Sequence, residues 1–248
     1  MDDAELAAAI AEEAGCLLTA LADAGRLTGK ALGDEGDRRA NDLILARLAA
    51  DRPHDAILSE ESADGPARLS ARRVWIVDPL DGTREYAAAR DDWAVHVGLA
   101  VDGVPSAGAV AVPRRGLVLS SAAPPPLPPE GEPLRIITSR TRPAPIAAYA
   151  AEQLGARLIR MGSAGAKVAA VMLGEADAYL HSGEQSEWDN LAPVAAALAA
   201  GLHCSRLDGT PLRYNRANVI VPDLLVCHPG RAAALVSLAA AFEGRGVP

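Results

Sequence analysis

The chain has 248 residues, and half of them are hydrophobic, which is enough for one large domain or for two smaller domains with cores of their own. Its formal net charge of −8 argues against non-specific binding to nucleic acid or to an anionic membrane surface, so an anionic ligand would need a local positive centre. Three widely spaced cysteines without a C-x-x-C pair argue against a disulfide framework and a thiolate zinc site, and they favour a reducing compartment.

The start of the chain and its hydropathy bear on location. The first residues, MDDAELAAAI, are acidic where a signal peptide would be basic. No apolar run approaches the ~18 residues that suggest a membrane span. We therefore expect a soluble, cytoplasmic protein.

The first part of the chain combines helical and strand-like patterns. Apolar residues recur at helical spacing over residues 6–21 and again over 40–48, before Pro53 ends the second pattern, so two amphipathic helices are predicted. Short strand-like runs follow at residues 56–59, 74–78 and 95–101. The Asp-Gly pair at 102–103 and the PRRG segment at 113–116 are turn signals, which predict an antiparallel meander.

The segment PPPLPPEGEP, at residues 124–133, is the clearest interruption of the chain, because its proline content excludes a helix or a central strand. We predict a domain boundary or a long crossover there, with an α+β part over residues 1–130 and an α/β part over residues 131–248. In the second part strands alternate with helices. The predicted strands are 134–139, 157–161, 177–181 and 223–227. Two helices are predicted over about 144–154 and over 164–173, a third helix is predicted to end at Gly201, and a last helix follows near the end of the chain.

The stretch WIVDPLDGTREY, residues 75–86, places two carboxylates three residues apart at the end of a strand-like run. Pro79 disfavours a helical conformation at Asp78, so the strand should stay extended and then turn sharply. Gly82 marks a position of positive φ or of close backbone approach. Two carboxylates held together repel each other unless a cation lies between them, and a hard divalent cation could also bind the Leu80 carbonyl.

This acidic turn also has a simpler interpretation, because an isolated D-x-x-D-G is usually a solvated turn. An EF-hand loop is excluded, since the twelfth position counted from Asp78 is Ala89 instead of Glu. Two further acidic motifs favour a metal site. LSEES supplies Glu60, with Glu61 as a supporting carboxylate, and WDN supplies Asp189 just before a predicted helix. Ligands tend to converge where structural elements end.

Three motifs, SEES, DPLDGT and WDNLAP, resemble in order and separation those of the lithium-sensitive, magnesium-dependent phosphatases. This superfamily includes inositol monophosphatase, fructose-1,6-bisphosphatase and 3'(2'),5'-bisphosphate nucleotidase, and the similarity covers nearly the whole chain. LDGTREY, and GSAGAK at residues 162–167, are similar to the CysQ branch, the bacterial 3'-phosphoadenosine 5'-phosphate phosphatases. The resemblance implies the layered α/β/α/β/α sugar-phosphatase fold, with the site between the α+β and the α/β parts.

Carried over residue by residue, the resemblance implies two or three Mg2+ ions per site. The implied metal ligands are Glu60, Asp78, the Leu80 carbonyl, Asp81 and Asp189. Glu60 and Thr83 are also expected to be catalytic, with Thr83 helping to hold the attacking water. Mg2+ shared among carboxylates neutralises a phosphate dianion and makes a water a better nucleophile. Such ions also reverse the local field, so a negatively charged protein can bind an anion.

Asp37 matches the position at which these relatives carry an aspartate that assists water activation. It also precedes the predicted helix RRANDLILARLAAD, where an N-cap residue is needed. The two interpretations are compatible, and both stay open. Gly36 stands where the family often has Thr or Ala.

The GSAGAK motif, one histidine and one arginine are the further candidates for substrate contacts. Backbone N–H groups at Ser163 and Gly165, where a predicted helix begins, suit a phosphate or ribose oxygen. Lys167 in the first turn opposes the helix dipole, which a nearby anion would explain; a snorkelling surface lysine is the alternative. His181 lies where relatives place a polar or basic substrate contact, and Arg84 either faces the substrate or pairs with the glutamate that follows it. The full set of expected substrate-binding residues is Asp81, Gly82, Thr83, Ser163, Gly165, Lys167, His181 and Asp189.

The leading hypothesis is a Mg2+-dependent, lithium-sensitive phosphomonoesterase that hydrolyses 3'-phosphoadenosine 5'-phosphate to AMP and phosphate in sulfate assimilation. The same chemistry would serve inositol 1-phosphate or fructose 1,6-bisphosphate, because the metal ions contact only the phosphate. A non-catalytic metal or nucleotide sensor is the alternative of a different class. The expected partner is a small phosphorylated nucleotide, without nucleic acid or membrane. Relatives occur as monomers and dimers, so a homodimer stays open.

Overall fold

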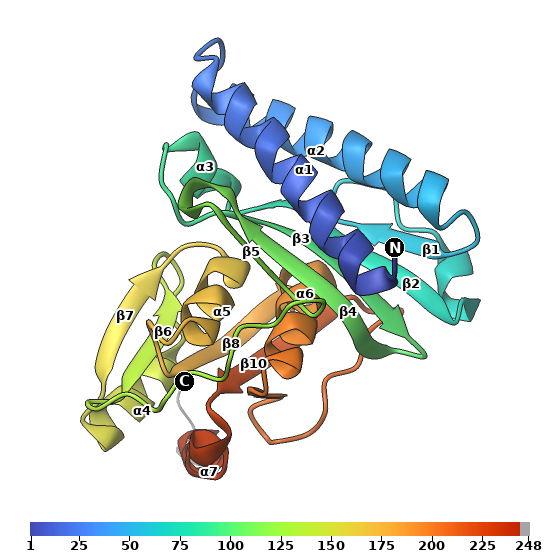
Figure 1. Ribbon diagram of the computed structural model, residues 1–248. Helices are drawn as coiled ribbons and strands as arrows, with labels where there is room; N and C mark the ends of the chain where they lie inside the picture. Colours follow the sequence, from blue (N-terminus) through green and yellow to red (C-terminus); the bar gives the residue numbers. More distant parts are fainter. Residues whose placement is uncertain (244–248) are drawn as a thin grey trace.

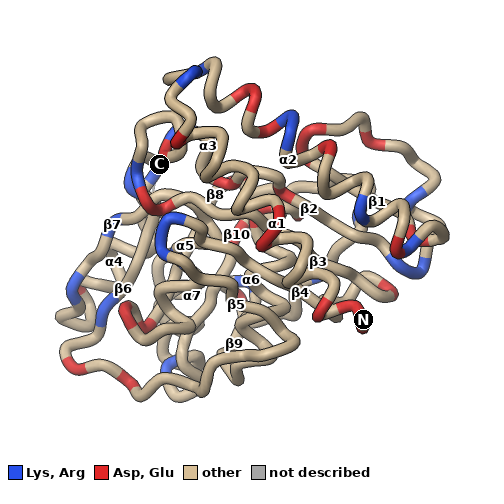
Figure 2. The backbone as a smooth tube through the Cα atoms, turned by 45° about the horizontal axis from the view of Figure 1, so that its top comes forward, with Lys and Arg blue, Asp and Glu red and all other residues tan. Residues whose placement is uncertain are grey.

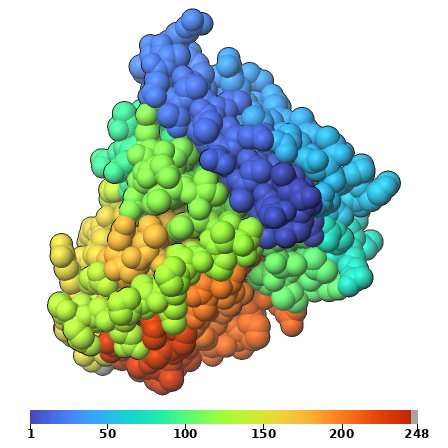
Figure 3. All heavy atoms as spheres, in the orientation of Figure 1, coloured from blue at the N-terminus to red at the C-terminus, as the bar shows by residue number. Residues whose placement is uncertain are grey.

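The computed structural model describes residues 1–243, in which two five-stranded sheets alternate with three pairs of helices (Figure 1). An outer helical pair covers the first sheet, a central pair separates the two sheets, and a third pair covers the outer face of the second sheet. This order confirms the expected α/β/α/β/α arrangement. The N-terminal helices and the C-terminal part of the chain lie at opposite ends of the molecule (Figure 3).

The outer pair consists of α1 (Asp3–Asp23) and α2 (Gly29–Asp51). Asp2 caps α1 and forms a capping box with Glu5, which satisfies the first backbone donors of the helix. The helix α2 starts nine residues before the predicted segment that begins at Arg38. The prediction that Asp37 is an N-cap residue is therefore wrong, because Asp37 lies inside the helix.

The first sheet has the strand order β1-β2-β3-β4-β5. Its strands are β1 (Ala56–Ser59), β2 (Arg73–Asp81), β3 (Ala94–Val101), β4 (Val104–Val112) and β5 (Leu117–Ser120). Only β1 and β2 pair in parallel, and the other pairs are antiparallel, which confirms the predicted meander. Asp102 and Gly103 have φ values of 52° and 73°, as a tight hairpin between β3 and β4 requires. A short helix, α3 (Thr83–Ala87), follows β2.

The central pair consists of α5 (Ala164–Met172) and α6 (Glu187–Ala199). The helix α6 packs on β3 and β4 at unusually close range: a Cβ at Gly108 would lie 2.4 Å from the carbonyl oxygen of Ala192. Glycine permits this approach because it has no side chain. Since α6 begins at Glu187, Asp189 lies in its first turn and not before the helix as expected.

The second sheet has the strand order β7-β6-β8-β10-β9. Its strands are β6 (Arg135–Ser139), β7 (Arg157–Met161), β8 (Ala178–Ser186), β9 (His203–Ser205) and β10 (Ile220–Cys227), and its outer helices are α4 (Pro145–Leu154) and α7 (Ala232–Glu243). β6 pairs in parallel with β7 and β8, whereas β10 is antiparallel to β8 and β9, so the sheet is mixed. The three-residue strand β9 was not predicted.

The connection between the sheets contains no helix or strand over residues 121–134, in agreement with the crossover predicted at 124–133. The division into domains at residues 130 and 131 stays a prediction. Short 3-10 helices are η1 (Pro66–Ser70), η2 (Pro113–Arg115) and η3 (Pro229–Arg231). Over residues 1–243, none of the helices combines the length and the apolar character needed to cross a membrane.

Candidate metal-dependent active site

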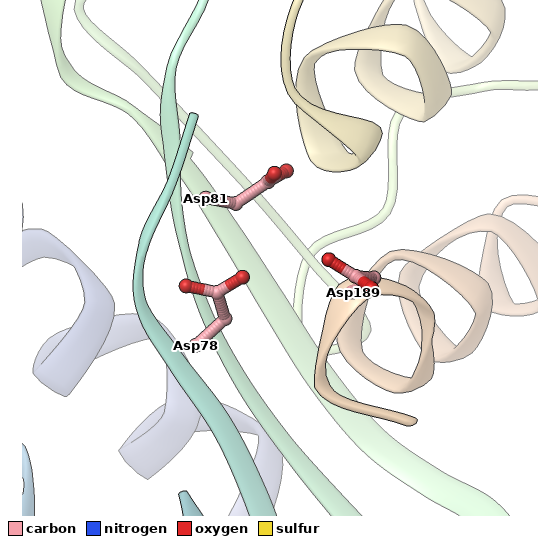
Figure 4. Close-up of side chains that lie close together, drawn as sticks. All are labelled: Asp78, Asp81 and Asp189. Carbon is pink, nitrogen blue, oxygen red and sulfur yellow. The ribbon is translucent and has the colours of Figure 1, made fainter. Parts of the chain in front are cut away.

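Three aspartates from two distant parts of the chain face one another (Figure 4). Asp78 and Asp81 lie at the end of β2, and Asp189 lies in the first turn of α6. One carboxylate oxygen of each residue lies within 4.8 Å of the others, and Asp78 and Asp81 are buried. A compact set of carboxylate oxygens suits a hard divalent cation, which is the role predicted for these three residues.

The irregular end of β2 explains why two aspartates three residues apart point toward the same space. The pairing of β2 with β3 is regular up to Asp78 and resumes only at Asp81, so the strand is distorted at Pro79 and Leu80. The Leu80 N–H donates to Asp78 Oδ1 over 3.0 Å and fixes this side chain. Gly82 then turns the chain with a φ of 94°, which confirms the predicted positive φ.

One oxygen of Asp81 is held by donors from other elements. The Ser163 hydroxyl donates to Oδ2, the Gly165 N–H donates to the same atom over 2.8 Å, and His96 Nε2 lies 3.2 Å from it. Burial alone would raise the pKa of Asp81, but the charges of His96 and Lys167 and the hydrogen bond from Ser163 together outweigh burial and lower this pKa. His96 is fully buried within β3. The substrate contacts predicted for Ser163 and Gly165 stay predictions.

Asp189 is also held through one of its oxygens. Its Oδ2 accepts a hydrogen bond from the Ser186 N–H over 2.6 Å, as part of the capping box of α6. Helix capping therefore orients the side chain. Burial, followed by the negative charge of Asp81, raises the pKa of Asp189 to about 6.

Glu60 follows β1 and lines the same cavity as the three aspartates, where it remains exposed on the cavity side. Partial burial, and then the charge of Asp189, raise its pKa to about 7. Burial, and then the charge of Glu60, raise the pKa of Asp78 well above its usual value. These raised values mean that the carboxylates lack sufficient positive charge around them. These carboxylate oxygens, together with the Leu80 carbonyl, therefore suit a hard divalent cation.

Asp37 reaches the site from the outer helical layer. Burial, and then the charges of Glu61 and Glu60, raise the pKa of its carboxyl group to about 7, and the neighbouring Thr83 lowers it by less. The Thr83 hydroxyl donates to the Leu80 carbonyl oxygen over 3.2 Å. The close approach of α2 depends on Gly33, where a Cβ would lie 2.8 Å from Thr83 Cγ2. A carboxylate with such a pKa suits proton transfer near neutral pH.

Lys167, in the first turn of α5, is buried, so the interpretation as a snorkelling surface lysine is wrong. Its Nζ donates to the carbonyl oxygens of Gly162 over 3.0 Å and of Ser163 over 2.6 Å, and it lies 5.2 Å from the centre of the Tyr179 ring. Burial lowers the pKa of Lys167 to about 8, against the charge of Asp81. Its positive charge thus balances the carboxylates from inside the protein.

The β8 side of the cavity is formed by Tyr179, His181 and Gln185. Gln185 Nε2 donates to the Tyr179 hydroxyl over 3.0 Å. Burial, and then the charge of Lys167, lower the pKa of His181 to about 4, so its ring is neutral at pH 7. His181 Nε2 and Gln185 Oε1 are buried without a hydrogen-bond partner among the described residues. Such atoms are uncommon in folded proteins, so this side of the cavity suits a polar ligand.

An ion-pair network joins the two halves of the molecule beside the cavity, which Glu85 also lines. Arg140, which follows β6, pairs with Glu85 of α3 over 3.0 Å and also pairs with Asp92. Asp92 accepts a hydrogen bond from the Gly162 N–H over 2.6 Å, which fixes the loop at the start of α5. The sequence analysis missed this network, because its members are far apart in the chain and carry no motif.

A cavity of about 320 Å³ brings most of the predicted site residues together. The predicted residues that line it are Glu60, Asp78, Leu80, Asp81, Gly82, Thr83, Ser163, Lys167, His181 and Asp189. Asp37 and Gly165 lie behind this surface, in contact with Thr83 and Asp81. Arg84 also lines the cavity, and Glu85 pairs with Arg140, so the predicted local pair between Arg84 and the glutamate after it does not form.

Comparisons with known proteins agree with this geometry. Residues 30–140 and 137–240 match the model of the Inositol monophosphatase family. A relative from Mycobacterium tuberculosis, named 3'-phosphoadenosine 5'-phosphate phosphatase, is 51% identical over 209 residues, which cover 79% of this chain and 77% of the relative. A relative of the same name from Mycobacterium leprae is 47% identical over 253 residues, which cover 96% and 93% of the two chains.

The fold is shared with solved structures as well. The crystal structure of CysQ from Bacteroides thetaiotaomicron matches with a TM-score of 0.77 and 25% identity, over 91% of this chain and 97% of that chain. The family model covers most of this sequence, and the aspartates of its DPLDGT and WDN motifs meet at one site. The chain therefore belongs to the inositol monophosphatase family, in its CysQ-type branch.

Proposed function

We propose that this protein is a Mg2+-dependent phosphomonoesterase that removes the 3'-phosphate of 3'-phosphoadenosine 5'-phosphate, giving AMP and phosphate. The observation that carries the proposal is the cluster of Asp78, Asp81 and Asp189, whose ligand oxygens lie within 4.8 Å of one another. The choice of substrate rests on the two mycobacterial relatives that are named for it and are 47% and 51% identical.

The residues of the chain would share the chemistry as follows. Those that would hold Mg2+ are Glu60, Asp78, the Leu80 carbonyl, Asp81 and Asp189. When bound, Mg2+ neutralises the phosphate oxygens and lowers the pKa of an attacking water. Asp37 would accept a proton from this water, and the Thr83 hydroxyl, whose own proton is donated to the Leu80 carbonyl oxygen, would orient the water by accepting a hydrogen bond from it. The donors from Ser163 and Gly165 hold Oδ2 of Asp81 and thereby fix the orientation of its carboxylate beside Asp78 and Asp189.

The substitution Asp81→Asn tests whether the carboxylate cluster is catalytic. It preserves the shape of the side chain and removes its charge, so Mg2+-dependent phosphate release should fall about a thousandfold, because a metal ion contributes several kcal/mol of charge stabilisation. Asp102→Asn is a matched control, since Asp102 forms only an exposed ion pair with Arg72. Equally slow release by the wild type and by Asp81→Asn would contradict catalysis and support a non-catalytic sensor.

A comparison of substrates tests the nucleotide assignment. Phosphate release should be measured from 3'-phosphoadenosine 5'-phosphate, inositol 1-phosphate and fructose 1,6-bisphosphate at equal concentrations. We expect the nucleotide to be hydrolysed fastest. Equal or faster hydrolysis of inositol 1-phosphate would overturn this assignment and leave the phosphatase chemistry intact.

Lithium sensitivity and a role in sulfate assimilation belong to the same proposal. We expect Li+ to inhibit by occupying one of the Mg2+ positions among the carboxylates, in competition with added Mg2+. Phosphate release that is indifferent to millimolar-range Li+ would argue against this part of the proposal. A cytoplasmic location and a homodimer remain predictions of the sequence.

A further inference from the structure

The strands β3 and β4 of the first sheet carry no Asp, Glu, Lys or Arg, so both are drawn in tan in Figure 2. One ionisable side chain, that of His96, interrupts this apolar pair of strands, and it is 0% exposed. Burial of a polar ring costs free energy unless the ring finds polar partners. The partners of His96 therefore indicate why a histidine lies at this place.

The two ring nitrogens of His96 contact the two segments that carry the aspartates of the site. Nδ1 lies 3.0 Å from the Trp188 carbonyl oxygen, and because a carbonyl only accepts, Nδ1 donates this hydrogen bond. Trp188 directly precedes Asp189 in the first turn of α6. Nε2 lies 3.2 Å from Oδ2 of Asp81, at the end of β2. One imidazole ring thus spans the gap between β2 and the start of α6.

The ring is also confined by the two helices of the central pair. A Cβ at Gly165, in the first turn of α5, would lie 2.0 Å from His96 Nε2 and 2.9 Å from its Cδ2. Gly98 follows His96 by two residues and therefore lies on the same face of β3. A Cβ at Gly98 would lie 3.0 Å from Ala192 Cα of α6. Both helices therefore approach this face of the strand closely, and the ring has a fixed place between them.

The other groups that hold these carboxylates each reach one of them. The Ser163 hydroxyl and the Gly165 N–H donate to Asp81. The Ser186 N–H donates to Asp189 from within the same helix cap. Of the groups that contact Asp81 or Asp189 in this way, His96 is the one that joins β2 to α6.

We infer that His96 is a positioning residue that sets the separation between Asp81 and Asp189. It does not belong to the lining of the cavity, so it acts through these two carboxylates and touches neither a metal ion nor the substrate. Replacement of a residue that supports metal ligands typically lowers metal affinity or activity about 10- to 100-fold. The inference rests on the proposed Mg2+-dependent function, because the separation of the carboxylates matters for catalysis only if they share a cation.

Two substitutions separate the two contacts of the ring. In His96→Asn the amide nitrogen lies near the place of Nδ1, so the donor to Trp188 remains and the contact with Asp81 is lost. In His96→Gln the longer side chain reaches toward the place of Nε2, so the contact with Asp81 remains and the donor to Trp188 is lost. Because a bridge needs both contacts, each variant should bind Mg2+ about 10- to 100-fold more weakly in calorimetry without substrate. At saturating Mg2+ the KM for the nucleotide should stay near the wild-type value, since His96 does not line the cavity.

His203→Asn is the matched control. His203 lies partly buried on β9 of the second sheet, with its Nε2 2.9 Å from Ser205 Oγ. Its replacement removes an imidazole and one hydrogen bond far from the carboxylates, so Mg2+ affinity should not change. A merely structural role of His96 would lower the unfolding midpoint but leave Mg2+ affinity at the wild-type value well below that midpoint, and this result would overturn the inference.

Gly165→Ala provides a second measurement, because the added methyl group would press against Nε2. It should weaken Mg2+ binding in the wild-type background. The loss should be smaller in His96→Asn, which lacks the ring atoms that the methyl group displaces. Equal losses in the two backgrounds would contradict a ring held between α5 and Asp81.

The outcomes separate the inference from the proposed function. A wild type that neither binds Mg2+ nor releases phosphate in its presence would refute the proposed function, and the inference with it. If the wild type does both and either His96→Asn or His96→Gln binds Mg2+ as tightly as the wild type, the function stands and the bridging role of His96 is wrong. Weaker Mg2+ binding in both variants, with His203→Asn unchanged, would support the bridge independently of turnover.

Discussion

The two carboxylate oxygens of Asp81 have different surroundings. Oδ2 accepts hydrogen bonds from the Ser163 hydroxyl and the Gly165 N–H and lies 3.2 Å from His96 Nε2, and the same carboxylate belongs to the cluster with Asp78 and Asp189. Hydrogen bonds to one oxygen commonly orient a metal ligand through the other. The D-x-x-D-G spacing predicts the ligand, but it does not reveal these donors, because they are remote in the sequence.

At Asp37 the raised pKa predicts a pH-dependent step. A base with a pKa of about 7 is protonated at lower pH, so kcat should rise with pH through about 7, and bound Mg2+ should shift this rise to lower pH. Asp37→Asn should lower kcat by about 10²- to 10⁴-fold and abolish this dependence. Asp42→Asn, an exposed position on the same helix, serves as the control. An unchanged pH profile of kcat in Asp37→Asn would refute the role as a base.

At the level of elements, helices with a clear apolar period were predicted well. Patterns over 144–154 and 164–173 became α4 and α5 within one or two residues. The first turns of α2, GKALGDEG, have no such period, and their glycines instead allow close packing on α3, so this part of the helix was not predicted. The helix α6 likewise packs closely because the strands that it covers carry glycines. This close packing places Asp189 beside β2.

The contact between α6 and β4 predicts a large effect at Gly108. A Cβ at this position would lie 2.4 Å from the backbone oxygen of Ala192, so Gly108→Ala should lower the free energy of unfolding by about 1–3 kcal/mol through overpacking. Because the displaced helix carries Asp189, the Mg2+ concentration needed for half-maximal activity should rise as well. Gly65→Ala is the control, since no atom lies within 4 Å of its Cβ position. Equal unfolding midpoints in urea for both variants would exclude this effect.

For the whole molecule, the carboxylate cluster links stability to pH and Mg2+. In the folded, metal-free protein the pKa values of Asp37, Glu60 and Asp189 are raised from 3.8 or 4.5 to about 7, 7 and 6, and that of Asp78 is raised well above its usual value. The folded state therefore holds protons that the unfolded state has lost, so stability should fall as the pH rises from about 4 to about 7. His181 and His203, whose pKa values are lowered, act in the opposite direction over part of this range, but four carboxylates outweigh two imidazoles.

Mg2+ should reverse this loss, because it binds the ionised carboxylates of the folded state. We expect the thermal unfolding midpoint to rise more on Mg2+ addition at pH 8 than at pH 5, as measured by calorimetry with and without a chelator. Asp78→Asn should reduce both the pH dependence and the response to Mg2+. A midpoint of the metal-free protein that rises steadily from pH 4 to pH 7 would show that other groups dominate.

The order of helices and strands, the family and the set of metal-ligand candidates can all be derived from the sequence, because they depend on local periodicity and on short motifs such as WIVDPLDGTREY and WDN. The folded structure was needed to show that Lys167 is buried and bound to its own loop, that Asp37 lies inside α2, and that Arg142 lines the cavity. These properties arise from contacts between segments that are distant in the chain. Such contacts depend on how the layers pack, and local sequence patterns carry no record of that packing.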